Sequence, residues 1–228
     1  MSDHYFTTAD ALDSALSAYI ADALASDAAT YGQATLVVSG GSTPKGLFKQ
    51  LSKTTIDWSA VTILLADDRW VPLDHEDSNE AMVRQTLLTD NATKANFISL
   101  VADYPDVPTN LARVEATVAA LPCFSVVILG MGGDMHTASL FPCSAELAEG
   151  LTTSDAVLMT HPTTAPHARV SLSKDRLLRT QRGLLHIVGD DKQQVLELAR
   201  NAGSEQIAPI SAFVTPNNSF EVWWAPKP

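Results

Sequence analysis

The sequence predicts a doubly wound α/β fold, in which a mainly parallel sheet is covered by helices on both faces. Short apolar runs rich in β-branched residues recur along the 228 residues, helical segments separate them, and the runs end in glycines or charges. Strands that alternate with helices favour parallel pairing, because each helix returns the chain to the start of the sheet. Since no internal segment resembles a linker, we expect a single domain over residues 1–228.

Composition and charge exclude several function classes. The formal net charge of −11 argues against a nucleic-acid partner, because such binding depends on basic surface against phosphates. No apolar run approaches the roughly 20 residues of a membrane span, and the first residues do not form a secretory signal. Cys123 and Cys143 do not form a CxxC pair. We therefore expect a soluble protein of the reducing cytoplasm, with no membrane partner.

The first two predicted elements are a helix and a buried strand. Residues 7–25 have apolar side chains on one helical face, and Thr7 and Asp10 have the spacing of a capping box. Residues 34–39 (ATLVVS) form a run that is typical of a strand buried on both faces. We expect the helix to pack against the sheet to which this strand belongs.

The strand ends in a loop suited to an anion. Gly40 and Gly41 would let backbone N–H groups approach a ligand, and Ser42 and Thr43 supply hydroxyl groups. Pro44 suits the first position of a helix, with Ser42 or Thr43 as its N-cap. The loop is either a phosphate site at a helix N-terminus or an ordinary glycine turn with a helix cap.

The named nucleotide motifs do not match this loop. After Gly46 the chain has Leu47 and Phe48, where a P-loop requires Lys followed by Ser or Thr. Neither glycine cluster of the sequence has the form GxGxxG followed by a ribose-binding acid. ATP and NAD are therefore poor candidates for the ligand.

A charged cluster follows the next predicted strand, residues 61–66. Asp67, Asp68 and Arg69 come directly before Trp70. The guanidinium of Arg69 could contact a phosphate or carboxylate in a bidentate manner. Alternatively, Arg69 and Asp67 form a local ion pair that steadies the loop.

The rest of the chain continues the alternation of helices and strands. We expect strands at 97–101, 157–160, 168–173, 184–188 and 220–225, and helices at about 78–88 (capped by Asp77, Ser78 or Asn79), 109–121 (capped by Thr109) and 191–201. Arg169 lies in one of these strands. Lys192 lies in the first turn of the last helix, where a cation opposes the helix dipole. Lys192 either faces a ligand anion at the same end of the sheet or is a solvated surface lysine.

The stretch with the clearest chemical character is SVVILGMGGDMHTASLFP, residues 125–142. A buried strand, residues 125–129, runs into a turn rich in glycine, and Asp134 and His136 follow at once. This places a carboxylate and an imidazole past the carboxyl end of a strand, where open α/β sheets bind ligands. The alternative is that the glycines only turn the chain, that His136 is an ordinary loop histidine and that Asp134 caps the next helix.

Five segments carry a resemblance that covers nearly the whole chain. They are SGGSTP at 39–44, DDRWVP at 67–72 followed by Ser78 and Asn79, GMGGDMHTASLFP at 130–142, ARVSLS at 168–173 and GDDK at 189–192. With them the sequence resembles the glucosamine-6-phosphate isomerase/6-phosphogluconolactonase family, and HTASLFP resembles its lactonase members, whereas the deaminases would show HIAFNEP. Two residues depart from the family pattern: Asp68 stands where Glu is common, and Met135 where glycine would allow a left-handed backbone.

The resemblance implies a NagB/RpiA-like fold and an activity, the hydrolysis of 6-phosphoglucono-δ-lactone in the oxidative pentose phosphate pathway. It implies His136 as the general base, Asp134 as the residue that orients or charges it, and Arg69 with the glycine-loop N–H groups as the oxyanion site. The phosphate would lie on Gly40, Gly41, Ser42 and Thr43, with Arg169 and Lys192 as its cationic partners. The substrate is then a small sugar-phosphate lactone, no cofactor is expected, and the chain would be a monomer or weak homodimer.

Other chemistries remain as alternatives or find no support in the sequence. The remaining histidines, His4, His75, His161, His167 and His186, are scattered without ligand spacing, so no metal is expected. No GxSxG elbow occurs, which weighs against a serine esterase. The alternatives are an amino-sugar phosphate deaminase or isomerase that uses the same phosphate loop, and a non-catalytic sugar-phosphate sensor.

Overall fold

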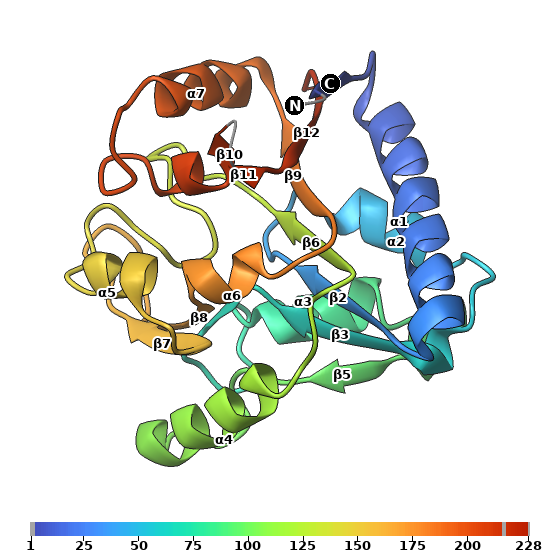
Figure 1. Cartoon of the computed structure of the whole chain (residues 1–228), viewed down its shortest axis with the longest axis horizontal. Helices are drawn as coiled ribbons and strands as arrows, with labels where there is room; N and C mark the ends of the chain where they lie inside the picture. Colours follow the sequence, from blue (N-terminus) through green and yellow to red (C-terminus); the bar gives the residue numbers. More distant parts are fainter. Residues whose placement is uncertain (1–2, 216–217, 228) are drawn as a thin grey trace.

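The computed structural model describes residues 3–215 and 218–227, and over these residues a seven-stranded parallel sheet runs through the molecule (Figure 1). Its strand order is β1-β12-β9-β6-β2-β3-β5. The strands are β1 (Asp3–Tyr5), β2 (Ala34–Val38), β3 (Val61–Leu65), β5 (Asn96–Ile98), β6 (Val126–Leu129), β9 (Gly183–Val188) and β12 (Glu221–Ala225). The predicted parallel sheet is confirmed, with β1 as an edge strand that the sequence patterns did not indicate.

Helices lie on both sides of this sheet. They are α1 (Ala9–Tyr31), α2 (Lys45–Leu51), α3 (Asn79–Thr86), α4 (Val107–Ala119), α5 (Leu147–Thr152), α6 (Lys174–Leu178) and α7 (Asp190–Arg200), with short 3₁₀ turns at Trp58–Ala60, Asp90–Lys94 and Pro209–Ala212. In Figure 1, α1 and α2 lie to the right of the sheet, and α4, α6 and α7 lie to its left. The predicted doubly wound arrangement is confirmed. Among the described helices, not one combines the length and the apolar character that a bilayer crossing requires.

Burial explains why the central strands form. Every residue of β2 and of β6 is buried, so both strands have apolar contacts on both faces. Helix α1 packs on β2, β6 and β12 through Leu12, Leu16, Ile20 and Leu24, each of which has 0% exposure. Each such side chain contributes about 1.5–3 kcal/mol by leaving water. These apolar contacts on both faces therefore place the central strands in the core.

Two smaller sheets accompany the main one. β4 (Asp67–Arg69), β8 (Arg169–Leu172) and β7 (Val157–Thr160) form an antiparallel sheet, and β10 (Val214–Thr215) pairs with β11 (Asn218–Ser219). In the first of these sheets Arg69 lies directly opposite Arg169. The segment predicted as a charged loop is thus a short strand that brings two arginines together.

The helix caps differ from the prediction at three of the four sites. Thr8 rather than Thr7 caps α1, because it is the Oγ1 atom of Thr8 that accepts the N–H of Ala11, at 3.1 Å. Asp106 rather than Thr109 caps α4, and its carboxylate accepts both the N–H and the hydroxyl of Thr109. Thr109 therefore lies inside the first turn of α4, three residues after the cap, rather than at the start of the helix.

The other two caps lie beside the sheet edge. Ser78 caps α3, as one of the three predicted candidates. At α2 the residue before the helix is Pro44, and no side chain caps the first turn. The prediction that Ser42 or Thr43 caps α2 is therefore wrong, and both hydroxyl groups stay exposed.

The strand order creates a crevice between β2 and β6. The chain proceeds from β2 through β3 to β5 on one side, then enters β6 and proceeds through β9 to β12 on the other. Ligands of open α/β sheets bind at such a reversal, beyond the carboxyl ends of the strands. Ser39 closes the base of the crevice, because its hydroxyl donates to the carbonyl of Ile128 at 3.1 Å and accepts the N–H of Gly130 at 3.3 Å.

Candidate active site

A cavity of about 210 Å³ opens at this reversal, and the segments predicted to carry chemistry meet in it. Its lining includes Gly40, Gly41, Ser42, Thr43, Arg69, His136, Arg169 and Lys192. The glycine and hydroxyl residues follow β2, His136 follows β6, the two arginines lie in β4 and β8, and Lys192 lies in α7. Asp134 is not part of the lining, but it contacts His136 directly. The structure therefore brings all nine predicted site residues to one place.

The loop after β6 is a tight turn closed by two backbone hydrogen bonds. The N–H of Gly132 donates to the carbonyl of His136 at 2.9 Å, and the N–H of Met135 donates to the carbonyl of Gly132 at 3.2 Å. Met135 has a φ of 68°, so the left-handed backbone forms here although the residue carries a side chain. A Cβ atom on Gly132 would lie 2.1 Å from Nδ1 of His136. Glycine at this position is what allows the imidazole to lie over the turn.

The imidazole of His136 is held by two contacts. Its Nδ1 atom lies 2.5 Å from Oδ1 of Asp134, and its ring stacks on Phe141 with a centroid distance of 3.9 Å. Because Nδ1 is committed to Asp134, Nε2 is the ring nitrogen left for a ligand. Asp134 does not cap the next helix, since α5 begins only at Leu147.

The residues after His136 anchor the loop to its surroundings. The hydroxyl of Thr137 donates to the carbonyl of Gly130 at 2.8 Å. The hydroxyl of Ser139 donates to Oδ2 of Asp67, in β4, at 2.5 Å. Phe141 supports the imidazole. The segment HTASLF thus ties the loop after β6 to the antiparallel sheet that holds the two arginines.

Arg69 projects into the cavity from β4. One of its NH1 hydrogens donates to the carbonyl of Asp77 at 2.8 Å and another to Oδ1 of Asn79 at 2.8 Å. Within the described residues its buried Nε atom has no hydrogen-bond partner. The predicted local ion pair with Asp67 does not form among the described contacts, because Asp67 pairs with Arg169 instead, at 3.8 Å.

Arg169 lies opposite Arg69 and is itself buried. Its guanidinium donates to the carbonyl of Pro166 at 3.2 Å and lies 5.4 Å from the ring centre of Phe141. Burial lowers the pKa of Arg169, although arginine remains a cation in proteins. Its Nε atom also lacks a partner within the described residues. Two cations with unsatisfied donors in one cavity suit an anionic ligand.

Lys192 approaches the cavity from the first turn of α7. Its Nζ atom donates to the carbonyl of Met131, in the loop after β6, at 3.0 Å. It is half-buried, and it lines the cavity together with Ser42 and Thr43. The alternative interpretation as a solvated surface lysine is therefore wrong.

Asp68 supports the site without lining the cavity. Its buried carboxylate accepts the backbone N–H groups of Asn79 at 2.7 Å, Glu80 at 3.0 Å and Arg69 at 2.8 Å. Burial raises the pKa of Asp68 to about 7, against the lowering effect of these N–H donors. Asp68, which is shorter than the Glu common in the family pattern, thus links β4 to the start of α3.

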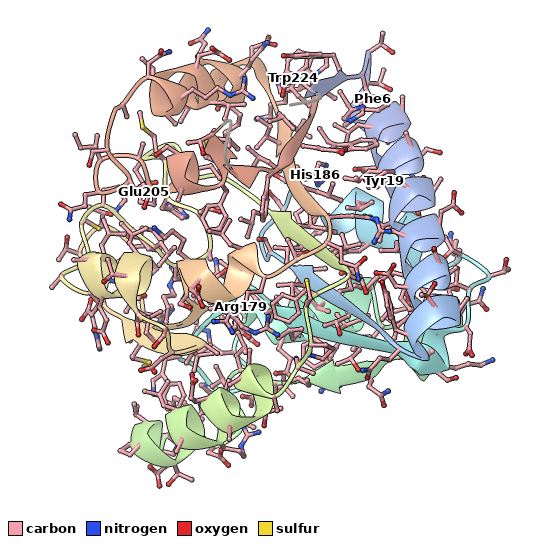
Figure 2. All side chains as sticks on the ribbon, viewed as in Figure 1. Phe6, Tyr19, Arg179, His186, Glu205 and Trp224 are labelled. Atoms are coloured by element: carbon pink, nitrogen blue, oxygen red, sulfur yellow. The ribbon has the colours of Figure 1, made fainter. Side chains whose placement is uncertain are left out.

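Five polar residues of the cavity lining were not selected as site residues from the sequence: Ser39, Asp67, Asn79, Thr137 and His186. The amide of Asn79 bridges Arg69 and the carbonyl of Asp67, and a Cβ atom on Gly40 would lie 2.0 Å from its Oδ1. His186, a residue of β9 that is labelled in Figure 2, is buried, and its Nε2 atom lies 3.4 Å from Oδ1 of Asp13 in α1. The only sequence signal for the contact between His186 and Asp13 was a histidine inside an otherwise apolar strand.

The interpretation of the remaining histidines as scattered is wrong for two of them. His75 and His167 lie with Asp77 in one cluster, in which the potential ligand atoms are all within 4.8 Å of one another. These residues come from the loops before α3 and before β8. Sequence spacing could not have indicated a contact between loops so far apart in the chain.

Comparisons with known proteins agree with this geometry. The family model for glucosamine-6-phosphate isomerases/6-phosphogluconolactonase matches residues 7–224. The chain is 37% identical over 227 residues to a 6-phosphogluconolactonase of Rhizobium meliloti, which covers 98% of both chains. It is 39% identical to a 6-phosphogluconolactonase of Pseudomonas aeruginosa, over 87% of this chain and 85% of the other.

A solved structure extends the likeness to the fold. A crystal structure of a 6-phosphogluconolactonase from Shewanella baltica superposes with a TM-score of 0.95 at 41% identity, and the match covers 99% of this chain and 97% of that one. The match of the family model across most of the chain, together with relatives above 30% identity, decides the assignment. The chain belongs to the glucosamine-6-phosphate isomerase/6-phosphogluconolactonase family.

Proposed function

We propose that this protein hydrolyses 6-phosphoglucono-δ-lactone to 6-phosphogluconate, the second step of the oxidative pentose phosphate pathway. The observation that carries the proposal is that His136, with Nδ1 fixed 2.5 Å from Asp134, shares one cavity with an exposed glycine and hydroxyl loop and three cations. A substrate that contains both an ester and a phosphate requires a base for the ester and anion-binding groups for the phosphate. This cavity contains both. The relatives named as 6-phosphogluconolactonases support the same reaction.

In this reaction His136 acts first as a base and then as an acid. Nε2 takes a proton from a water molecule, and the water oxygen attacks the lactone carbonyl carbon. When the tetrahedral intermediate collapses, the bond from this carbon to the ring oxygen breaks, and the imidazolium returns the proton to that oxygen. Asp134 holds the ring and stabilises the imidazolium that forms between the two steps.

The rest of the cavity binds and polarises the substrate. The phosphate lies against Gly40, Gly41, Ser42 and Thr43, and Arg169 and Lys192 balance its charge. Arg69, with backbone N–H groups of the loop after β6, stabilises the oxyanion. Holding the phosphate fixes the carbonyl relative to His136, which removes much of the entropic barrier.

An assay on two substrates tests the proposal. The purified protein is mixed with freshly generated lactone, and acid release is followed at constant pH against the spontaneous rate. A parallel reaction contains glucosamine 6-phosphate and is followed by ammonia release. We expect catalysed lactone opening only. Ammonia release would support the deaminase alternative, and tight binding of phosphogluconate without turnover would support the sensor alternative.

The proposal also covers the organisation of the protein. We expect residues 1–228 to form a single domain, the protein to be cytoplasmic, and the chain to be a monomer or weak homodimer. The cavity supports the single domain, because it draws residues from Ser39 to Lys192 into one site. Cys123 and Cys143 are both free cysteines, as is usual in a reducing compartment, which supports a location in the cytoplasm. Sedimentation of the purified chain across a concentration series measures the oligomeric state.

A further inference from the structure

A second cluster of chemically active side chains lies beside the cavity but does not line it. His75 and Asp77 belong to the loop between β4 and α3, and His167 belongs to the loop before β8. Their potential ligand atoms lie within 4.8 Å of one another, and all three residues are half-buried. Two imidazoles and a carboxylate form a donor set that zinc and related divalent metals bind in proteins.

The distances in the cluster are close to those of a metal site. Oδ2 of Asp77 lies 2.9 Å from Nε2 of His167 and 3.9 Å from Nδ1 of His75. Two ligands of a tetrahedral zinc ion with bonds of 2.0–2.1 Å are roughly 3.3 Å apart. The two measured separations bracket this value, and the ligand atoms of His75 and His167 lie within 4.8 Å of each other, so side-chain rotations would bring all three to one ion.

The hydrogen bonds show which atoms can ligate. Nδ1 of His75 accepts the backbone N–H of Asp77 at 3.1 Å, so this nitrogen carries a lone pair rather than a proton, and a metal bound to that lone pair would replace this hydrogen bond and leave the N–H of Asp77 to solvent. Nε2 of His167 donates to the Asp77 carboxylate, and a metal would replace that proton, which is released to solvent.

The backbone supports a functional interpretation of His167. Its φ is 67°, in the left-handed region that a residue with a side chain adopts at a cost of about 1–3 kcal/mol. This conformation brings its ring 5.2 Å from that of His75 in an edge-on arrangement. A single ion pair between the two loops would need only one imidazole and one carboxylate. The cluster has two imidazoles that share one carboxylate.

The cluster also connects the two loops that hold the arginines of the cavity. Arg69 donates to the backbone carbonyl of Asp77 at 2.8 Å, and Arg169 donates to that of Pro166, next to His167, at 3.2 Å. A metal ion bound at the cluster would therefore fasten the anchors of both guanidinium groups to each other. It would stiffen one wall of the cavity without touching the substrate.

We propose that His75, Asp77 and His167 form a binding site for a divalent transition metal of the zinc class, distinct from the catalytic cavity, which joins the loop before α3 to the loop before β8. This site goes beyond the proposed lactone hydrolysis and does not require a metal in that reaction. The three side chains supply three ligands, and water completes the coordination.

Metal binding to the full-length chain tests the proposal directly. Calorimetric titration with Zn²⁺ and visible spectra with Co²⁺ are recorded for the wild type and for His75→Ala, His167→Ala and Asp77→Asn. For the wild type we expect one ion per chain and a four-coordinate Co²⁺ spectrum. Each variant should lose more affinity than the cost of losing an outer-shell partner, which is about 10–100-fold. Asp77→Asn is the most selective variant, because Arg69 binds the backbone carbonyl of Asp77 and keeps its anchor.

The matched control is His161→Ala. His161 is also a histidine paired with a carboxylate, Glu146 at 2.8 Å, but no second imidazole accompanies it in the described clusters. This variant should bind Zn²⁺ as the wild type does. Zn²⁺ should raise the melting temperature of the wild type and of His161→Ala but not that of the three cluster variants. This comparison holds even where a variant is less stable.

Two outcomes would overturn the proposal. One is Zn²⁺ binding that survives all three substitutions and disappears in His136→Asn, since the metal would then belong to the catalytic pair. The other is no binding at concentrations up to the millimolar range. Neither readout involves lactone turnover, so a failure here is distinct from a failure of the proposed reaction.

Discussion

Two histidine–carboxylate pairs in this protein have nearly the same local geometry but different surroundings. Nδ1 of His136 lies 2.5 Å from Asp134, and Nδ1 of His161 lies 2.8 Å from Glu146. In each pair the carboxylate fixes one ring nitrogen and leaves the other available. The pairing alone therefore does not distinguish a catalytic histidine from a structural one.

The surroundings make the distinction. His136 stacks on Phe141, its side chain is 28% exposed, and it lines the cavity beside cationic groups. The side chain of His161 is 61% exposed and lies outside this cavity. Only the inner pair follows a central strand of the sheet at the reversal of strand order. Position in the fold, more than the pair itself, supports the proposed role of His136 as the general base.

The largest expected effect is on turnover, from the same substitution in each pair. His136→Asn should lower kcat about 10²–10⁴-fold with little change in KM, because it removes the proposed general base and leaves the proposed binding groups. His161→Asn is the matched control and should retain wild-type kcat. Initial rates on fresh lactone measure both. Equal losses of kcat in the two variants would mean that the position of His136 in the cavity gives it no catalytic role that His161 lacks.

A substitution in the turn displaces the inner pair without removing it. Gly132→Ala would place a Cβ atom 2.1 Å from Nδ1 of His136 and 2.5 Å from Oδ1 of Asp134. We expect kcat to fall by about 10²-fold, the typical cost of a misplacement of about 1 Å. Gly133→Ala is the control in the same turn, because its Cβ would meet nothing within 4 Å. A normal kcat for Gly132→Ala would show that the orientation of the imidazole is not critical.

The comparison extends to cations inside and outside the cavity. Arg169→Ala and Lys192→Ala should each raise KM about 10–100-fold, as the loss of a charge-assisted hydrogen bond worth about 1.5–3 kcal/mol predicts. Arg179→Ala is the control, because Arg179 is exposed and pairs with Asp175 at the surface. Steady-state kinetics at saturating and low lactone separates KM from kcat. An unchanged KM in both cavity variants would place the phosphate elsewhere.

The fold and most of the site could be predicted because their signals are local. The runs at β2, β3 and β6 are apolar, and parallel strands end at one edge, so the residues after them must meet. The antiparallel sheet was only partly predictable. Its strand β4 is three residues long and charged. It forms because its backbone pairs with β8, with Arg69 opposite Arg169, about a hundred residues away in the sequence.

Other features depend on contacts that sequence patterns do not encode. The choice of Thr8 over Thr7 as the cap of α1 depends on where the first turn begins, which packing of the helix decides. The meeting of His75 with His167 and that of Asp13 with His186 depend on tertiary placement. Such pairs are invisible to spacing rules, which apply within one element.

The smallest expected effect concerns the outer pair and the free energy of unfolding. Burial raises the pKa of Glu146, but hydrogen bonds from Ser144 and His161 outweigh it and lower the pKa to about 2, from the usual 4.5. A carboxyl group with a lowered pKa stabilises the fold above its unfolded value and loses that contribution as the pH falls. The stabilisation is therefore complete above about pH 5 and disappears between about pH 4.5 and 2.

Glu146→Gln isolates this contribution. Urea unfolding of the wild type and the variant should differ by about 1 kcal/mol near pH 7, the upper range for partly exposed pairs, and the difference should vanish toward pH 2. Lactone turnover near pH 7 should be unchanged, because Glu146 lies outside the cavity. A difference in unfolding free energy that stayed constant from pH 7 to pH 2 would mean that the charge of Glu146 has no part in it. The outer pair would then contribute through packing and neutral hydrogen bonds, and the two pairs would differ in chemistry as well as in position.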